Sequence, residues 1–272
     1  FSKRILRGED TTVQVLIDGT NGTTGSALLG YMQAVIINYA GSLQEARLGV
    51  ETTELLPIDY RPRVWFNPEL ESNQYLIPGL VAFILVVTAV ISTALSVVRE
   101  KELGTLEQIA ASPLRPVDLI LGKTLPYMVI SAVIAASVFV ASYFFFDVGV
   151  AGSLLWLGGV TLLFLFACLG LGIFISSIAE TQQVAFLIAI LSTFLPSFIL
   201  SGFVFPIENM PVLIQAATYL VPARYYLSAL RAIMLKGAGV MVFWPDVLLL
   251  AIFAAATVGA GIFRLRTRSV LA

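Results

Sequence analysis

Five stretches of the chain carry no charged residue and are each long enough to cross a lipid bilayer as a helix. A helix rises about 1.5 Å per residue, so about 20 apolar residues cross a hydrocarbon core of ~30 Å. Only 12% of the residues are charged, against about 25% in soluble domains, and the mean hydropathy is +0.92. We therefore predict a mainly α, polytopic α-helical membrane protein. The predicted spans lie near residues 78–98, 124–146, 154–178, 183–201 and 246–264.

The first 76 residues have a different pattern, with frequent charges and short apolar segments. Thr11–Asp18 alternates and is rich in β-branched residues, which predicts a strand. Ser26–Ala40 has apolar residues at helical spacing with Ser26 as the candidate N-cap, and Arg63–Phe66 is a candidate second strand. We predict a small α/β domain over residues 1–76 and a transmembrane domain over residues 77–272.

The segment 202–236 is apolar, but prolines and charges interrupt it. Irregular backbone at membrane depth is tolerated only where protein or a water-filled cavity surrounds it. We therefore predict two short helices, near 211–220 and 223–236, that enter one face of the bilayer or lie on it.

Basic residues in short loops predict the orientation. The loop 99–123 contains four of them, the loop 147–153 contains none, and the C-terminal tail contains Arg264, Arg266 and Arg268. The positive-inside rule then places loop 99–123 and the C-terminus in the cytoplasm and residues 1–76 outside. An external domain without a signal peptide requires an earlier span, so we expect this sequence to be a fragment that lacks a first helix.

The composition argues against an enzyme. The chain has no histidine, which removes the usual general base and the commonest zinc ligand, and its single cysteine, Cys168, lies in an apolar run. The segment Leu121–Thr124 resembles the end of a phosphate-binding loop, but Val117 occupies the position where that motif needs a glycine. A net charge of −1 gives no basic surface for nucleic acid. We expect no catalytic site, no metal and no cofactor in this chain.

Residues 103–112 predict a short amphipathic helix in the loop between the first two spans. Gly104 breaks the preceding helix, Thr105 with Gln108 matches a capping box, and Pro113 stops the new helix. Helices that lie on anionic lipid usually carry Lys or Arg on the polar face, whereas this face carries Glu107 and Gln108. The pattern favours a helix that docks into a cytoplasmic protein, and a helix resting on lipid headgroups is the alternative.

Three segments resemble a known family: RVWFNPELESNQYLIPGLVAFIL (63–85), VVREKELGTLEQIAASPLRPVDLILGKTLPY (97–127) and LPSFILSGFVFPIENMPVLIQAATYLVPARYYLSALRAIMLKG (195–237). They resemble the ABC-2 type permeases of bacterial ATP-binding cassette exporters, in the inner-membrane multidrug-type branch with a large external domain. The resemblance covers essentially the whole chain.

That resemblance implies a permease subunit with six spans in the full-length protein, two permeases (homo- or heterodimer) over two ATPase subunits, and a periplasmic adaptor as a further candidate partner. ATP and Mg²⁺ would then be bound by the ATPase. Segment 103–112 would be the coupling helix, and 202–236 an external re-entrant hairpin that gates the exit. The implied coupling residues are Arg99, Glu100, Lys101, Glu102, Gly104, Thr105, Leu106 and Glu107. The implied gate residues are Gly202, Pro206, Pro222, Arg224 and Tyr225.

Two other functional classes stay open at this point. A secondary, ion-coupled transporter would need ionisable groups at mid-membrane, and the sequence has none clearly there. A membrane scaffold or sensor that does not transport is the second alternative.

Overall fold

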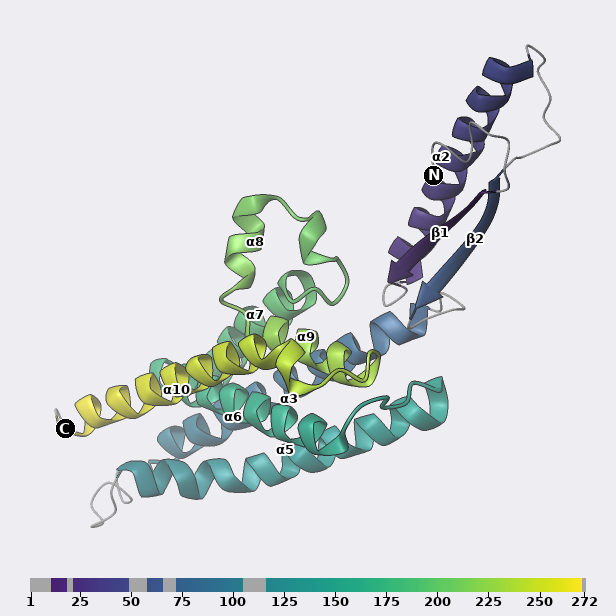
Figure 1. Cartoon of the computed structure of the whole chain (residues 1–272). Coiled ribbons are helices and arrows are strands. Elements are labelled where there is room, and N and C mark those ends of the chain that lie inside the picture. Colours follow the sequence, from purple (N-terminus) through teal and green to yellow (C-terminus); the bar gives the residue numbers. More distant parts are fainter. Residues whose placement is uncertain (1–10, 19–21, 49–57, 66–71, 105–115, 271–272) are drawn as a thin grey trace. The chain divides into compact units, whose positions relative to one another are not determined.

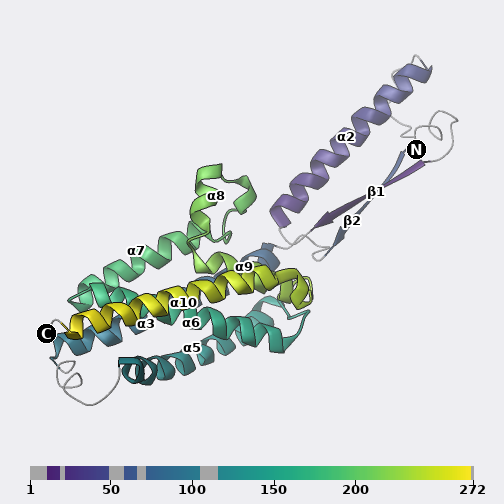
Figure 2. The ribbon, with the colours of Figure 1, turned by 60° about the vertical axis from the view of Figure 1, so that its left-hand side comes forward.

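The computed structural model describes residues 11–18, 22–48, 58–65, 72–104 and 116–270. The chain divides into two compact units, Phe1–Tyr75 and Leu76–Ala272. Figures 1 and 2 show the helices and strands of each unit.

The described residues of the first unit form two parallel strands and the helix between them. Strand β1 (Thr11–Asp18) pairs with β2 (Ile58–Trp65) in a register that sets Thr11 opposite Ile58, and helix α2 (Gly22–Leu48) lies between them in the sequence. Parallel strands need a long crossover, which α2 provides. The predicted strand at Thr11–Asp18 is confirmed, and the second strand is longer than predicted. The N-cap prediction is wrong: Ser26 lies inside α2, because the helix already begins at Gly22.

The second unit is built from helices. Among the described residues, five helices are long and apolar enough to cross a membrane, as the charge-free stretches predict. The long helices are α3 (Ser72–Glu102), α5 (Pro116–Phe146), α6 (Leu154–Ile178), α7 (Gln182–Leu200) and α10 (Val240–Val270). Three short elements follow α7: the 3₁₀ turn η1 (Ile207–Asn209), α8 (Val212–Thr218) and α9 (Pro222–Met234).

Helix α10 begins earlier than the charge pattern predicts. The prediction starts at residue 246, directly after Pro245, but the helix runs through that proline from Val240. A proline in a helix removes one backbone hydrogen bond, and neighbouring groups in a membrane protein compensate for this.

Helix α6 lies at the centre of the bundle, and α10 packs along it. Glycine allows this helix to approach its neighbours closely. A Cβ atom added at Gly172 would lie 2.9 Å from the backbone oxygen of Val90, and one added at Gly170 would lie 2.7 Å from Oγ1 of Thr257. The backbones of α3 and α10 therefore pack directly against α6, as is common between membrane helices.

Helices α5 and α7 contribute few buried residues. Large apolar side chains such as Val133 and Phe145 on α5 and Leu191 on α7 are exposed in the isolated chain. In a bilayer these side chains meet lipid or another protein subunit, so their exposure is expected for a membrane protein.

Candidate functional site

Helix α3 ends in a glycine turn at the start of the predicted coupling segment. Gly104 has a φ of +70°, a left-handed conformation that favours glycine, and its N–H donates to the carbonyl oxygen of Lys101 (3.1 Å). The N–H of Leu103 donates to the carbonyl oxygen of Arg99 (3.0 Å). The prediction that Gly104 breaks the helix is confirmed. Leu103 and Gly104 form this turn and are not helical, so a coupling helix cannot begin at residue 103.

Lys101 connects the end of α3 to the end of α6. Its Nζ donates to the carbonyl oxygens of Ser176 and of Ala179, the latter at 3.1 Å. Ala179 is the C-cap residue of α6, so these carbonyls belong to the last turn of that helix. The last turn of a helix has carbonyls without intrahelical partners and the negative end of the helix dipole, both of which favour a cation.

Glu102 makes the complementary contact with the start of α7. Its Oε1 accepts a hydrogen bond from the backbone N–H of Gln182 (2.7 Å), and its Oε2 accepts one from Nε2 of Gln182. Gln182 is the first residue of α7, and the side chain of the N-cap Thr181 accepts from the N–H of Val184 (3.3 Å). A carboxylate is favoured at a helix N-terminus because the helix dipole is positive there.

Lys101 and Glu102 therefore bind the two sides of the α6–α7 turn. The positive charge of Lys101 meets the C-terminal end of α6, and the negative charge of Glu102 meets the N-terminal end of α7. We call this pair, with the groups it binds on residues 176–182, the α3 clamp. Beneath it, buried Val98 packs with Ala179 and Ala185. The spacing of these residues in the sequence gave no indication of the contact, because the partners lie about 80 positions apart.

The other predicted coupling residues lie on the last turns of α3 or outside the described residues. Arg99 is exposed and Glu100 half-buried on the last turns of α3. Thr105, Leu106 and Glu107, with the predicted capping box and Pro113, lie outside the described residues.

Two of the predicted gate residues bind the α8–α9 turn together. The guanidinium of Arg224 lies 3.8 Å from the centre of the Tyr219 ring, and its Nη1 donates to Oγ1 of Thr218. The hydroxyl of Tyr225 donates to the carbonyl oxygen of Tyr219 (2.7 Å). Burial raises the pKa of the Tyr225 phenol, an effect that the Arg224 charge partly offsets.

Gly202 marks the point where the chain leaves α7. Its φ is +82°, and its carbonyl oxygen accepts a hydrogen bond from Nη1 of Arg231 on α9 (3.0 Å). Pro206 precedes η1, and Pro222 is the first residue of α9, where its lack of an N–H costs nothing. The predicted gate residues thus lie at the ends and turns of the elements after α7. The structure brings Arg224 and Tyr225 together at one turn and places Gly202 against Arg231, which the sequence analysis did not select.

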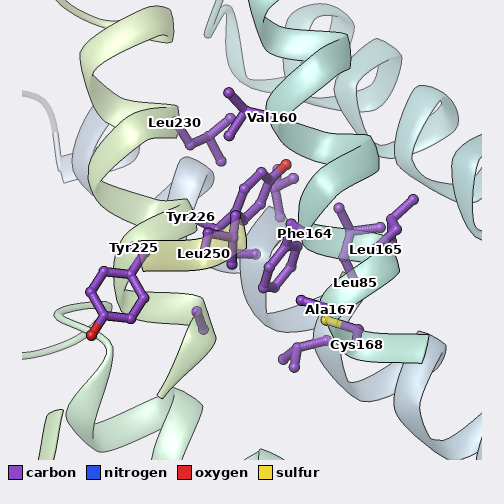
Figure 3. Packing of buried hydrophobic residues seen from close by; sticks show 14 of the residues in the cluster. Leu85, Val160, Phe164, Leu165, Ala167, Cys168, Tyr225, Tyr226, Leu230 and Leu250 are labelled. Atoms are coloured by element: carbon purple, nitrogen blue, oxygen red, sulfur yellow. The ribbon is translucent and has the colours of Figure 1, made fainter. Parts of the chain in front are cut away.

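Helix α9 is anchored in the bundle by one aromatic pair. The Tyr226 and Phe164 rings lie side by side (Figure 3), nearly parallel at 4° and with centres 4.1 Å apart. The Tyr226 hydroxyl is 3.0 Å from Oγ1 of Thr161. Tyr226 is fully buried, so burial raises the pKa of its phenol, which the hydrogen bond with Thr161 partly offsets. Tyr225 and Tyr226 are neighbours in the sequence, but they make different contacts: Tyr225 bonds within the α8–α9 turn, and Tyr226 lies in the core.

A second polar contact joins α9 to α10. Oγ of Ser228 donates to Oδ2 of Asp246 (2.7 Å), a residue in the second turn of α10. Neither residue was selected from the sequence, because a lone acidic residue beside Trp244 and Pro245 resembles an ordinary interfacial charge. Within the part of the chain that the structure describes, no group of three or more His, Cys, Asp or Glu side chains is arranged to hold a metal ion.

Comparison with known proteins identifies the chain's relatives. The sequence profile described as "ABC-2 family transporter protein" matches residues 1–263. The probable multidrug ABC transporter permease YbhS of Escherichia coli (strain K12) is 36% identical over 269 residues, which cover 98% of this chain and 70% of that protein. The probable multidrug ABC transporter permease YbhR of the same strain is 31% identical over 271 residues, covering 100% and 72%. The inner membrane transport permease YhhJ, also of this strain, is 30% identical over 270 residues, covering 98% and 70%.

The five helices of membrane-spanning length and composition among the described residues define a multi-pass membrane protein. The chain belongs to the ABC-2 family of transporters. It is a permease subunit, the non-catalytic membrane component of such a transporter, and ABC permeases typically pair with an ATPase subunit.

Proposed function

We propose that this permease forms the translocation pathway of an ATP-driven exporter in a bacterial inner membrane. The observation that carries the proposal is the match to the YbhS, YbhR and YhhJ permeases along almost the whole chain. Two of these relatives are named as probable multidrug permeases, which supports lipophilic small molecules as the substrate class.

The proposed topology follows the positive-inside rule. Loop 99–123 and the C-terminus face the cytoplasm, and residues 1–76, with the β1–α2–β2 unit, form an extracytoplasmic domain. The chain spans about 70% of the length of these relatives.

The proposed energy source is a separate ATPase subunit, which binds ATP and Mg²⁺. Two permease subunits pair over two ATPases, and residues 103–112 dock into the ATPase through Gly104, Thr105, Leu106 and Glu107. ATP binding shifts the permease only if this segment contacts the ATPase differently in the two states, since a ligand moves an equilibrium by its differential affinity.

The proposed exit gate is the segment 202–236. Its internal bonds support this role, because Arg224 and Tyr225 stiffen the α8–α9 turn while Arg231 ties α9 to the end of α7. A stiff hairpin attached to a span moves as a unit when that span moves.

The test is transport by the permease reconstituted in vesicles with its ATPase partner. We expect uptake of the lipophilic cation ethidium to require Mg·ATP and to persist when ion gradients are collapsed. Leu106→Asp should abolish ATP-dependent uptake while membrane insertion continues, and Glu180→Gln, an exposed carboxylate in the α6–α7 turn, should leave uptake unchanged. Uptake that follows an ion gradient instead would establish a secondary transporter, and a complex that neither hydrolyses ATP nor transports would establish a scaffold or sensor.

A further inference from the structure

The buried face of helix α7 offers little resistance to sliding along the helix axis. Its buried residues are all small: Ala185, Ala189, Thr193 and Ser197, spaced four apart. Large side chains interdigitate and resist sliding, whereas a row of small residues presents a smooth face. The axial position of α7 therefore depends on the contacts at its two ends.

At the far end from Gln182, aromatic rings make the contact. Phe83 of α3 lies 5.0 Å from Phe194 and 5.9 Å from Phe198, measured between ring centres. These ring contacts hold the C-terminal half of α7, because aromatic pairs prefer particular geometries. The position of its first turn depends on the contacts at the other end.

At the near end, the α3 clamp supplies directed hydrogen bonds. Glu102 accepts from both the backbone N–H and the side-chain amide of Gln182, and Lys101 binds the preceding end of α6. Helix α6 also follows α3 closely, because at Gly172 it packs directly on the α3 backbone. A displacement of the last turn of α3 therefore carries the end of α6 and the start of α7 with it.

We propose that Lys101 and Glu102 are positioning residues that transmit movement of segment 103–112 to α7 through the α6–α7 turn. This rests on the proposed function, in which an ATPase moves that segment. Leu103 and Gly104 are the first two residues of this segment and follow the clamp directly in the chain. Lys101 and Glu102 lie on α3, and the helix whose position they control is α7.

Gln182→Pro offers a sharp test, because it removes both donors to Glu102 without disrupting α7. Proline is favoured at the first position of a helix, where the N–H has no intrahelical partner. The preceding residue, Thr181, has φ −122° and ψ 153°, which is the extended conformation that a following proline requires. A change in behaviour can therefore be assigned to the lost contact with Glu102.

The experiment places one environment-sensitive fluorophore on α7 in the full transporter complex. Cys168→Ala removes the single cysteine of this sequence, and Leu191→Cys introduces an exposed attachment site for the fluorophore. The added nucleotide is Mg·ATP with vanadate. We expect ATP to change the emission of the unmodified complex. Glu102→Ala and Gln182→Pro should each remove most of this change.

Two further variants separate positioning from general stability. Combining Glu102→Ala with Gln182→Pro should reduce the response no further than either alone, because both remove the same contact. Glu180→Ala, in the same turn, should keep the full response, and all variants should retain ATP hydrolysis by the partner. A full α7 response in Glu102→Ala and Gln182→Pro, additive losses, or no ATP-induced response in a hydrolysing unmodified complex would each overturn the inference. A complex without ATP hydrolysis would instead overturn the proposed function.

Discussion

The aromatic ring of Tyr226 stacks on that of Phe164 with the ring centres 4.1 Å apart, which fixes the short helix α9 to the central helix α6. The Tyr226 hydroxyl meets Oγ1 of Thr161 one turn away on the same helix. One residue of a proline-rich segment thus makes both an apolar and a polar contact in the core.

Tyr226→Phe and Tyr226→Ala should separate these two contacts. The phenylalanine keeps the stack and loses the hydrogen bond, which should lower the free energy of unfolding by about 1 kcal/mol. The alanine also leaves a cavity, for which we expect about 3–5 kcal/mol. Thermal unfolding of the detergent-solubilised protein measures both. The hydroxyl contact is unimportant if Thr161→Val and Tyr226→Phe both leave the midpoint unchanged.

Gly172→Ala should disturb the packing of α6 against α3. The added methyl group would lie 2.8 Å from Cβ of Thr93 and 2.9 Å from the backbone oxygen of Val90, so one backbone must move. Overpacking of this kind costs about 1–3 kcal/mol. Gly159→Ala, on the same helix with nothing within 4 Å, is the matched control and should be neutral or stabilising. Equal midpoints for the two variants would contradict the close approach of α3 and α6.

Gly104→Ala should loosen the last turn of α3. Nothing lies within 4 Å of the added methyl group, so the cost comes only from the left-handed φ of +70° and amounts to about 1 kcal/mol. Gly122→Ala, which also has open space but sits within helix α5, should have the opposite sign. Hydrogen exchange of the amides of residues 99–103 should increase in the first variant and not in the second.

Arg224→Lys should loosen α8 although the charge is kept. Lysine cannot place a planar group over the Tyr219 ring while donating to Thr218. We expect hydrogen exchange of the α8 amides to become faster, by the factor that corresponds to a loss of about 1 kcal/mol of local stability. Tyr225→Phe, which loses its bond to the Tyr219 carbonyl, should act in the same direction. Tyr143→Phe, at a 58% exposed residue on α5, is the control, and an equal effect there would count against the structure of this turn.

Cys168 should resist maleimide labelling in the folded protein. Its side chain is fully buried in the core between α6 and its neighbours (Figure 3), and it is the only cysteine in the chain. Labelling should proceed only after denaturation with sodium dodecyl sulfate. Rapid reaction in the native state would show that this part of the core is open.

Much of the helical bundle was predictable because the bilayer restricts what a chain can do. A lipid-exposed backbone must satisfy its own hydrogen bonds, so an uncharged stretch of about 20 residues becomes a helix. The stretch at 154–178 coincides with α6, and Gly104 ends α3 as the turn chemistry predicts. Less predictable were the helix ends: α10 passes through Pro245, and α2 begins before Ser26. The hydrophobic pattern predicts which residues cross the bilayer, but it carries little information about the residue at which a helix starts.

The sequence by itself determined the number of apolar helices, the charged end of α3 and the short helices after α7, because each depends on neighbouring residues and on the solvent around them. The tertiary structure alone decided which groups those residues meet. Lys101 and Glu102 are adjacent in the chain, yet one binds the end of α6 and the other the start of α7. Tyr225 and Tyr226 are adjacent too, and one closes a turn while the other stacks in the core. The bonds of Lys101, Glu102 and Tyr226 join residues 65 to 80 positions apart, and they exist only once the helices have packed. The bond of Tyr225 joins residues 6 positions apart.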